Sequence, residues 1–314
     1  MIFSWLRNRR RRKLLSEPFP IRWEPFLRAN VWHFTRLSDP EQARLRDIVR
    51  VLIAEKTWEG AGGLFVTEEM KVTIAAQAGL LLLGLDHDYY ARVASIVVHP
   101  GKFRTPQRED DWEDDELSDQ EADGMAVYRG PVILSWQDVL PEGRDPDEGF
   151  NAVIHEFAHQ LDYLDNAVNG TPPLGDRELE SRWKYVMTVA YEDHRRAVNR
   201  GETELFFSEQ AADNETEFFA DSSEAFFCRP LDMRDLYPDV YRLLGAYLTS
   251  RAVSMRKPIR VLESRCGEVA EWSNASVSKT DIPSRVSRVR IPASPLGKTH
   301  REAQRGLPVS HSKS

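Results

Sequence analysis

The stretch His155-Glu156-Phe157-Ala158-His159-Gln160-Leu161-Asp162 places two histidines four residues apart, with a glutamate directly after the first. Residues four apart on an α-helix lie one above the other, so both imidazoles can reach one metal ion. Apolar residues recur around them at helical spacing: Phe150, Val153, Ile154, Phe157, Ala158 and Leu161. The pattern predicts a helix that packs by its apolar face and carries His155, His159 and Asp162 on another face.

Two histidines separated in this way, with the glutamate between them, form the H-E-x-x-H pattern of zinc peptidases. We therefore expect His155 and His159 to bind Zn²⁺ and Glu156 to act as the catalytic carboxylate on a water molecule. The alternative is a chance match on a solvated surface helix. Such a helix would not need the apolar residues that flank the motif on both sides.

A catalytic zinc site needs a third protein ligand and one open position. The best source is Asn214–Phe227, where Glu217, Asp221 and Glu224 fall on one helical face at i, i+4 and i+7. Aromatic residues occupy the rest of this helix: Phe218, Phe219, Phe226 and Phe227. We interpret Glu217 as the third ligand and Asp221 as an acceptor that orients a zinc-bound imidazole. The alternative is an amphipathic helix with a solvated acidic stripe.

At these residues the chain resembles the bacterial Mlc titration factor A peptidases, whose catalytic domain is similar to that of anthrax lethal factor. His155–Asp162 matches the family's H-E-F-A-H-Q-L-D block, and Glu217–Phe227 matches E-F-F-A-x-x-S-E-x-F-F. Further matches in the same order extend the resemblance from about Phe19 to about Leu248: Ala54–Lys56, Gly60–Gly63, Val72–Ala78, Leu80–Leu83, Gly130–Trp136 and Gly170–Leu174.

The resemblance implies an α+β fold, a mainly helical zincin-like metallopeptidase with a small mixed sheet beside the H-E-x-x-H helix. It implies His155, His159 and Glu217 as zinc ligands, Glu156 as the catalytic residue, and a cytoplasmic enzyme with aminopeptidase activity. It also implies a link to the Mlc repressor of sugar-uptake genes. The alternative function is a repressor-binding regulatory module in which peptidase activity is incidental.

One position departs from the family pattern. Seven residues before the third ligand the family usually carries a tyrosine that supports the transition state, and this chain has Gln210. An amide can donate a hydrogen bond to an oxyanion, but it cannot act as a phenolic acid. We keep Gln210 and Asp162 as further candidates for groups that support the site.

Two strands are predicted just before the metal helix, Gly124–Tyr128 and Val132–Trp136. In peptidases of this architecture, the resemblance implies, a strand edge beside the helix binds extended peptide through backbone hydrogen bonds. The candidate edge consists of Val132, Ile133, Leu134 and Ser135. The alternative is that these residues form an ordinary core strand.

Composition limits the remaining possibilities. The 314 residues are 41% hydrophobic and carry a net charge of −8, which argues against direct nucleic-acid binding. Cys228 and Cys266 show no metal or disulfide spacing, which fits a reducing cytoplasm. No segment is long enough to span a membrane, so no membrane partner is expected.

The domain organisation follows from local patterns. We expect a basic segment at 1–18, one domain at 19–256 with an acidic loop at 109–123, and a disordered tail at 257–314. The basic segment is interpreted as a solvated, frayed terminus; the alternative is contact with anionic lipid or an acidic partner. The acidic loop is interpreted as solvated and able to cover the active site. For the tail, the competing view is a basic arm that binds nucleic acid.

Other elements are predicted from capping and periodicity. Ser38 should cap a helix to about Lys56, and Thr67 should cap a second helix through Leu81. Short strands are expected at Leu64–Val66 and Ile96–Val98, with His99 in a structural role. Helical spacing after the metal motif predicts helices around Leu179–Ala190 and Val240–Tyr247.

Overall fold

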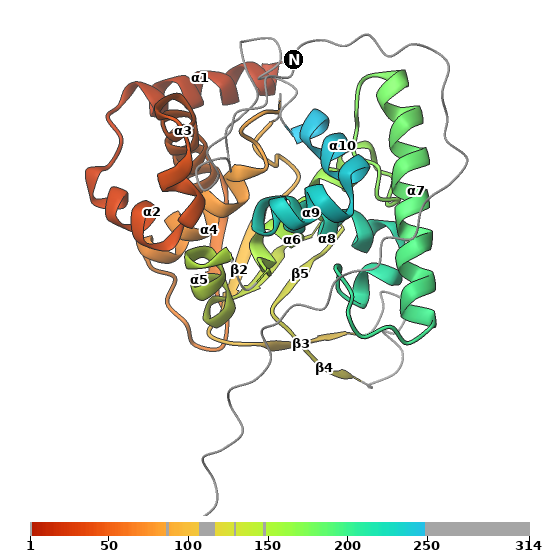
Figure 1. Ribbon diagram of the computed structural model, residues 1–314. Helices are drawn as coiled ribbons and strands as arrows, with labels where there is room; N and C mark the ends of the chain where they lie inside the picture. The colour runs from red at the N-terminus through yellow and green to blue at the C-terminus, as the bar shows by residue number, and fades with distance from the viewer. Residues whose placement is uncertain (1, 86–87, 107–116, 129, 147–148, 249–314) are drawn as a thin grey trace, which may run out of the picture. The chain divides into compact units, whose positions relative to one another are not determined.

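The computed structural model describes residues 2–85, 88–106, 117–128, 130–146 and 149–248. Contacts divide the chain into Met1–Gly267 and Glu268–Ser314, and only the first unit contains described residues. The fold is mainly helical with a small mixed sheet, which confirms the predicted class (Figure 1). The predicted tail at 257–314 lies outside the described residues.

The first half of the chain forms a helical layer against the sheet. Its α-helices are α1 (Ile2–Ser16), α2 (Glu24–Asn30), α3 (Asp39–Glu55) and α4 (Glu68–Leu80). The predicted caps are present, because Ser38 and Glu41 form a capping box and Thr67 Oγ1 accepts from the backbone N–H of Met70 at 3.3 Å. The Leu80–Leu83 run is buried in the core, as the sequence predicts.

The expectation of a frayed N-terminus is wrong. Residues 2–16 form α1, and its Arg11 is only 8% exposed. Both oxygens of Glu55 accept from the Arg11 guanidinium at 2.6 Å, and Asp88 contacts the same group. Arg50 on α3 also donates to the backbone carbonyl of Glu17 at 2.7 Å. Because these contacts join α1 to the domain, the basic residues here are in part structural.

Four strands form the main sheet in the order β1-β2-β6-β5. They are β1 (Thr57–Gly60), β2 (Ser95–His99), β6 (Val132–Ser135) and β5 (Gly124–Ala126). The first three are parallel, and β5 pairs antiparallel with β6. The strand expected at Leu64–Val66 is absent. Instead, the backbone at Leu64 turns back toward Gly60. The approach is so close that a Cβ on Gly60 would lie 1.8 Å from the Leu64 carbonyl oxygen.

The candidate substrate edge at Val132–Ser135 is not an edge. Strand β6 is bonded to β2 on one side and to β5 on the other, so its backbone groups are already paired. The chain returns from β5 through a tight connection in which the Val127 N–H donates to the Pro131 carbonyl at 3.1 Å. This return places β5 at the end of the sheet, and β5 is the edge strand that contacts the helix of the H-E-x-x-H motif.

Part of the predicted acidic loop is also a strand. β3 (Phe103–Pro106) and β4 (Leu117–Ala122) form a separate antiparallel pair. The rest of the loop, residues 107–116, lies outside the described residues. Its predicted role as a cover over the site is therefore untested.

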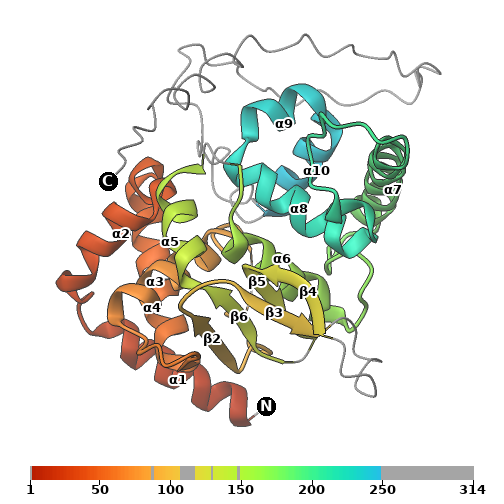
Figure 2. The same cartoon turned by 90° about the horizontal axis from the view of Figure 1, so that it is seen from below.

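The second half of the chain is helical. It comprises α5 (Trp136–Arg144), α6 (Ala152–Asp162), α7 (Arg177–Asn199), α8 (Glu215–Cys228), α9 (Pro230–Leu236) and α10 (Pro238–Leu248). Figures 1 and 2 show α1–α4 on one flank and α7–α10 on the other, with the sheet and α6 between them. The core extends across this arrangement and includes Phe34, Phe157, Trp183 and Phe219. None of the described helices has the length and apolarity needed to cross a membrane.

Candidate metal centre

Helix α6 carries the two histidines. Asn151 caps it by accepting from the Ile154 N–H at 2.9 Å, and the predicted apolar face from Val153 to Leu161 is buried. Phe150 is an exception, since it precedes the helix and is 58% exposed. The two imidazoles lie next to each other on the other face, with ring centroids 5.0 Å apart.

Glu217 on α8 meets both histidines. His155 Nε2 lies 3.2 Å from Glu217 Oε2, and His159 Nε2 lies 3.5 Å from Glu217 Oε1. Neighbouring ligand atoms of a tetrahedral zinc ion with bonds of about 2.1 Å lie about 3.4 Å apart. The three side chains therefore fit one such ion. The structure brings the three side chains of the predicted set together from two distant segments, with their ligand atoms within 4.8 Å of one another.

The electrostatics of this cluster favour an ionised carboxylate. Burial raises the pKa of Glu217, but hydrogen bonds from His155 and His159 outweigh it and bring the pKa well below its ordinary value. Burial lowers the pKa of His155, whereas Glu217 and Glu224 raise it, and the net shift is upward. The ionised Glu217 is in the state that metal binding requires, whereas a bound cation would have to displace the proton that the two carboxylates favour on His155.

Glu156 lies beside the ligands in a buried position. It is 7% exposed, and burial raises its pKa to about 7 against the opposing charges of His155 and His159. Gly124 of the edge strand β5 packs directly on it, since a Cβ there would lie 2.7 Å from Glu156 Cγ and Oε1. A carboxyl with a pKa near neutrality can both accept and donate a proton at physiological pH.

Glu224, and not the predicted Asp221, contacts the imidazole of His155. His155 Nδ1 lies 3.2 Å from Glu224 Oε2, and Glu224 Oε1 accepts from the Asn151 N–H at 2.5 Å. Asp221 lies nearby but accepts from the Ser208 N–H at 2.7 Å, so the prediction that it orients the imidazole is wrong. Sequence did carry the signal, because Glu224 is on the same helical stripe as Glu217.

Asp162 and Gln210 do not join the cluster around Glu217. Asp162 is fully buried and accepts from the backbone N–H groups of Asn169, Gly170 and Thr171 and from the Thr216 hydroxyl. Through these hydrogen bonds Asp162 connects the turn after α6 to the start of α8. Gln210 begins the short helix η5 (Gln210–Ala212), which packs against α8, and its side chain is exposed.

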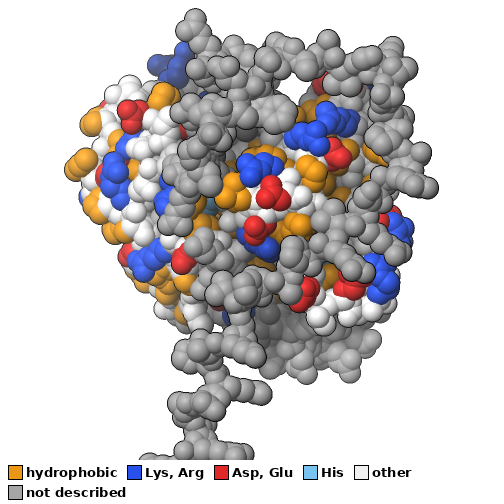
Figure 3. Space-filling view, viewed as in Figure 1, with side chains coloured by type: hydrophobic (Ala, Val, Ile, Leu, Met, Phe, Trp, Pro, Cys, Tyr) orange, Lys and Arg blue, Asp and Glu red, His pale blue; other side chains and the backbone are white. Residues whose placement is uncertain are grey.

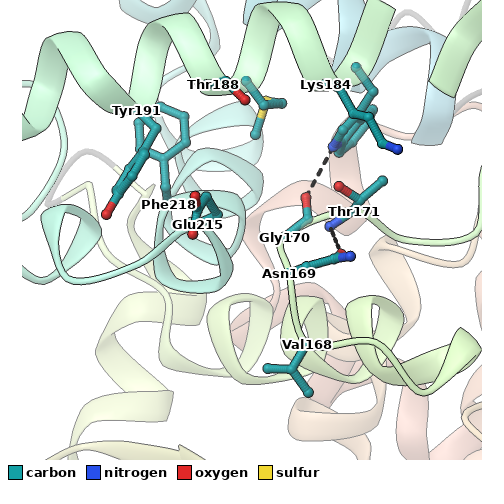
Figure 4. A pocket seen from close by; sticks show the side chains of 11 residues that line it. Val168, Asn169, Gly170, Thr171, Lys184, Thr188, Tyr191, Glu215 and Phe218 are labelled. Atoms are coloured by element: carbon teal, nitrogen blue, oxygen red, sulfur yellow. Dashed lines mark hydrogen bonds between the residues drawn. The ribbon is translucent and has the colours of Figure 1, made fainter. Parts of the chain in front are cut away.

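A cavity of about 270 Å³ lies between α7, α8 and the turn held by Asp162 (Figure 4). Met187, Tyr191 and Phe218 supply apolar walls, and Trp183 Nε1 donates to the Gly170 carbonyl at 3.0 Å. Glu215, two residues before Glu217, lies on its lining. Among the described residues visible on the face shown in Figure 3, cationic and acidic side chains are interspersed and form no single basic patch.

An H-E-x-x-H helix beside a second helix that brings a carboxylate to the two histidines is typical of metallopeptidases, and sequence comparisons agree. The chain belongs to the glucose-regulated metallo-peptidase M90 family, whose profile matches residues 5–248. It is similar to an uncharacterized protein of Synechocystis, 29% identical over 247 residues that cover 77% of this chain and 88% of the relative. It is also similar to Mlc titration factor A of Yersinia pestis and Yersinia pseudotuberculosis, 28% identical over 244 residues that cover 76% of this chain and 86% of the relatives.

Proposed function

We propose that this metallopeptidase is a zinc enzyme that hydrolyses peptide bonds, with aminopeptidase-like action, through a metal-activated water. The convergence of His155, His159 and Glu217 supports a site for one ion with a vacant position. Two nitrogens and one carboxylate are a ligand set that suits zinc. When bound, zinc supplies Lewis-acid polarisation of the substrate carbonyl and activation of water.

The chain's own residues then perform the proton transfers. Glu156 takes a proton from the attacking water and passes it to the leaving amine. Its buried position and its raised pKa of about 7 suit a group that must alternate between base and acid. Glu224 keeps the ring of His155 oriented while Nε2 serves as a ligand.

Extended substrate would align along β5, the strand that forms the sheet edge. The Gly124 backbone lies against Glu156, so a peptide paired with β5 would lie beside the catalytic carboxylate. We propose β5 in place of the predicted β6, because β6 is already hydrogen-bonded to a strand on each side.

The Glu156→Gln variant tests the catalytic role. The amide retains the shape of the side chain but cannot take the proton, so we expect unchanged zinc content and a loss of roughly 10²- to 10⁴-fold in peptide turnover. Turnover is measured with aminopeptidase model substrates on protein of known zinc content. Turnover equal to that of the parent would rule out the assigned role.

The similarity to Mlc titration factor A favours a second function, in which the protein binds an Mlc-type repressor. Repressor binding is measured with the parent, the metal-free protein and the Glu156→Gln variant. Equal binding by all three proteins would show that repressor binding requires neither the metal nor Glu156. Absence of binding by all three would rule out the repressor-binding function.

A further inference from the structure

Helix α1 orients its charges in an unusual way. Arg7 and Arg11 turn toward the domain, where Asp88 contacts both and Glu55 contacts Arg11. The Arg11 guanidinium also lies 4.5 Å from the ring centroid of Tyr89. These two arginines attach α1 to the rest of the domain. The other basic residues of the helix do not take part in this attachment.

The outer face of α1 combines exposed apolar and cationic side chains. Trp5 is 54% exposed and Leu6 is 40% exposed. Arg9, Arg10, Arg12 and Lys13 are also exposed. Within the described part of the chain, none of these four cations has a carboxylate oxygen within 4.0 Å.

The helical spacing gathers these groups into one stripe. Trp5, Arg9, Arg12 and Lys13 follow i, i+4, i+7 and i+8, and Arg9 lies 5.6 Å from the Trp5 ring centroid. The apolar pair occupies the N-terminal end, and the cations follow it along the helix. In both views α1 lies at the outside of the molecule, packed on α3 (Figures 1 and 2).

The charge of α1 opposes that of the chain. The helix contains six cationic residues and no acidic one, whereas the whole chain carries −8. A negatively charged surface would therefore attract this helix and repel the remainder, which orients the molecule on approach. An indole and an aliphatic side chain next to arginines and lysine suit the boundary between headgroups and acyl chains of an anionic membrane.

We propose that α1 is a peripheral docking element for an anionic phospholipid surface. Trp5 and Leu6 enter the headgroup region, and Arg9, Arg12 and Lys13 bind lipid phosphates. The rigid attachment through Arg11 presents the stripe already folded, so binding needs no ordering of a flexible segment.

The test is sedimentation of the full-length protein with vesicles. One set contains phosphatidylcholine alone and the other contains phosphatidylserine mixed with phosphatidylcholine. We expect binding to the second set only, and release when NaCl rises from about 0.05 M to about 0.5 M. Arg9→Gln/Arg12→Gln/Lys13→Gln should weaken this binding by about tenfold or more, as should Trp5→Ala/Leu6→Ala.

The matched control is Arg195→Gln/Arg196→Gln/Arg200→Gln, which removes three exposed cations from α7 and its end. It should bind vesicles like the parent, and equal melting temperatures would show that all variants are folded. Two results overturn the proposal: equal loss in the control, or no binding to the anionic vesicles. Binding to polyglutamate in the second case would identify an acidic protein partner instead.

Discussion

At the scale of single residues, the site depends on a carboxylate placed between two imidazoles. Glu217 offers one oxygen to each ring at 3.2 and 3.5 Å, and Glu224 holds the far nitrogen of His155. His155 thus contacts two carboxylates of α8, whereas the α8 carboxylate that contacts His159 is Glu217. The position of α8 against α6 thus determines whether a metal can bind.

Replacing Glu224 should weaken metal binding without removing a ligand. In Glu224→Gln one of the two acceptor oxygens is lost, so either His155 Nδ1 or the Asn151 N–H loses its partner. We expect a loss of roughly 10- to 100-fold in metal affinity, measured by competition with a chromophoric chelator. Asp221→Asn is the comparison variant, and a larger loss there than in Glu224→Gln would restore the original prediction for Asp221.

Gly124 should be required for catalysis but not for metal binding. A methyl group at this position would lie 2.7 Å from Glu156 Cγ and Oε1, so Gly124→Ala must displace the catalytic side chain. We expect turnover to fall by roughly tenfold or more with metal content retained. Gly245→Ala in α10 is the control, since among the described residues its Cβ would meet Phe226 alone, at 3.9 Å, and its turnover should match that of the parent.

The residues at the site were predictable to differing degrees. His155, Glu156 and His159 follow from spacing within one helix, and Glu217 follows from the need for a third ligand. The choice between Asp221 and Glu224 could not be made in this way. Both lie on the stripe of Glu217, and only the packing of α8 on α6 decides which one reaches His155.

At the scale of elements, a buried histidine links the N-terminal helices to α8. His33 in η2 (Trp32–Arg36) donates from Nε2 to the Phe227 carbonyl at 3.0 Å, at the end of α8. Burial lowers the pKa of His33 to about 4 from the usual 6.5. Between about pH 4 and pH 6.5, His33 therefore binds a proton in the unfolded chain but not in the native state.

Stability should consequently fall as the solution is acidified. The contribution of His33 is fully present above pH 6.5 and is lost as the pH falls toward 4, and this amounts to about 3 kcal/mol. His33→Gln retains a donor for the Phe227 carbonyl and removes the titration. Urea unfolding of both proteins at several pH values should show a smaller acid loss in the variant. An identical loss would assign the acid sensitivity to other groups.

Elements with local signals agree with the sequence predictions, and those fixed by tertiary contacts do not. Caps and helical spacing place α3, α4, α6, α7, α8 and α10 correctly. The sheet edge differs from the predicted one, because β5 pairs on the outer side of β6 through a connection that leaves no periodic pattern. Helix α1 was missed because its inner face is charged, and its stability depends on Glu55 and Asp88, distant in sequence.

At the scale of the whole molecule, the family profile indicates how far the domain extends. Its buried residues extend from Trp23 to Leu248, and the family profile matches residues 5–248. We propose that the domain ends near residue 256. A chain shortened to residues 1–256 should keep the melting temperature and the metal content of the parent, measured by calorimetry and elemental analysis. A lower melting temperature would assign a stabilising role to residues 257–314.

The central claim is that His155, His159 and Glu217 together bind one ion. Metal content after exhaustive dialysis tests it most directly in three proteins: the parent, Glu217→Ala and Glu215→Ala. Glu215 is an exposed carboxylate two residues earlier on the same helix. We predict about one zinc ion per chain in the parent and in Glu215→Ala, and a loss in Glu217→Ala. Full metal content in Glu217→Ala would contradict the claim.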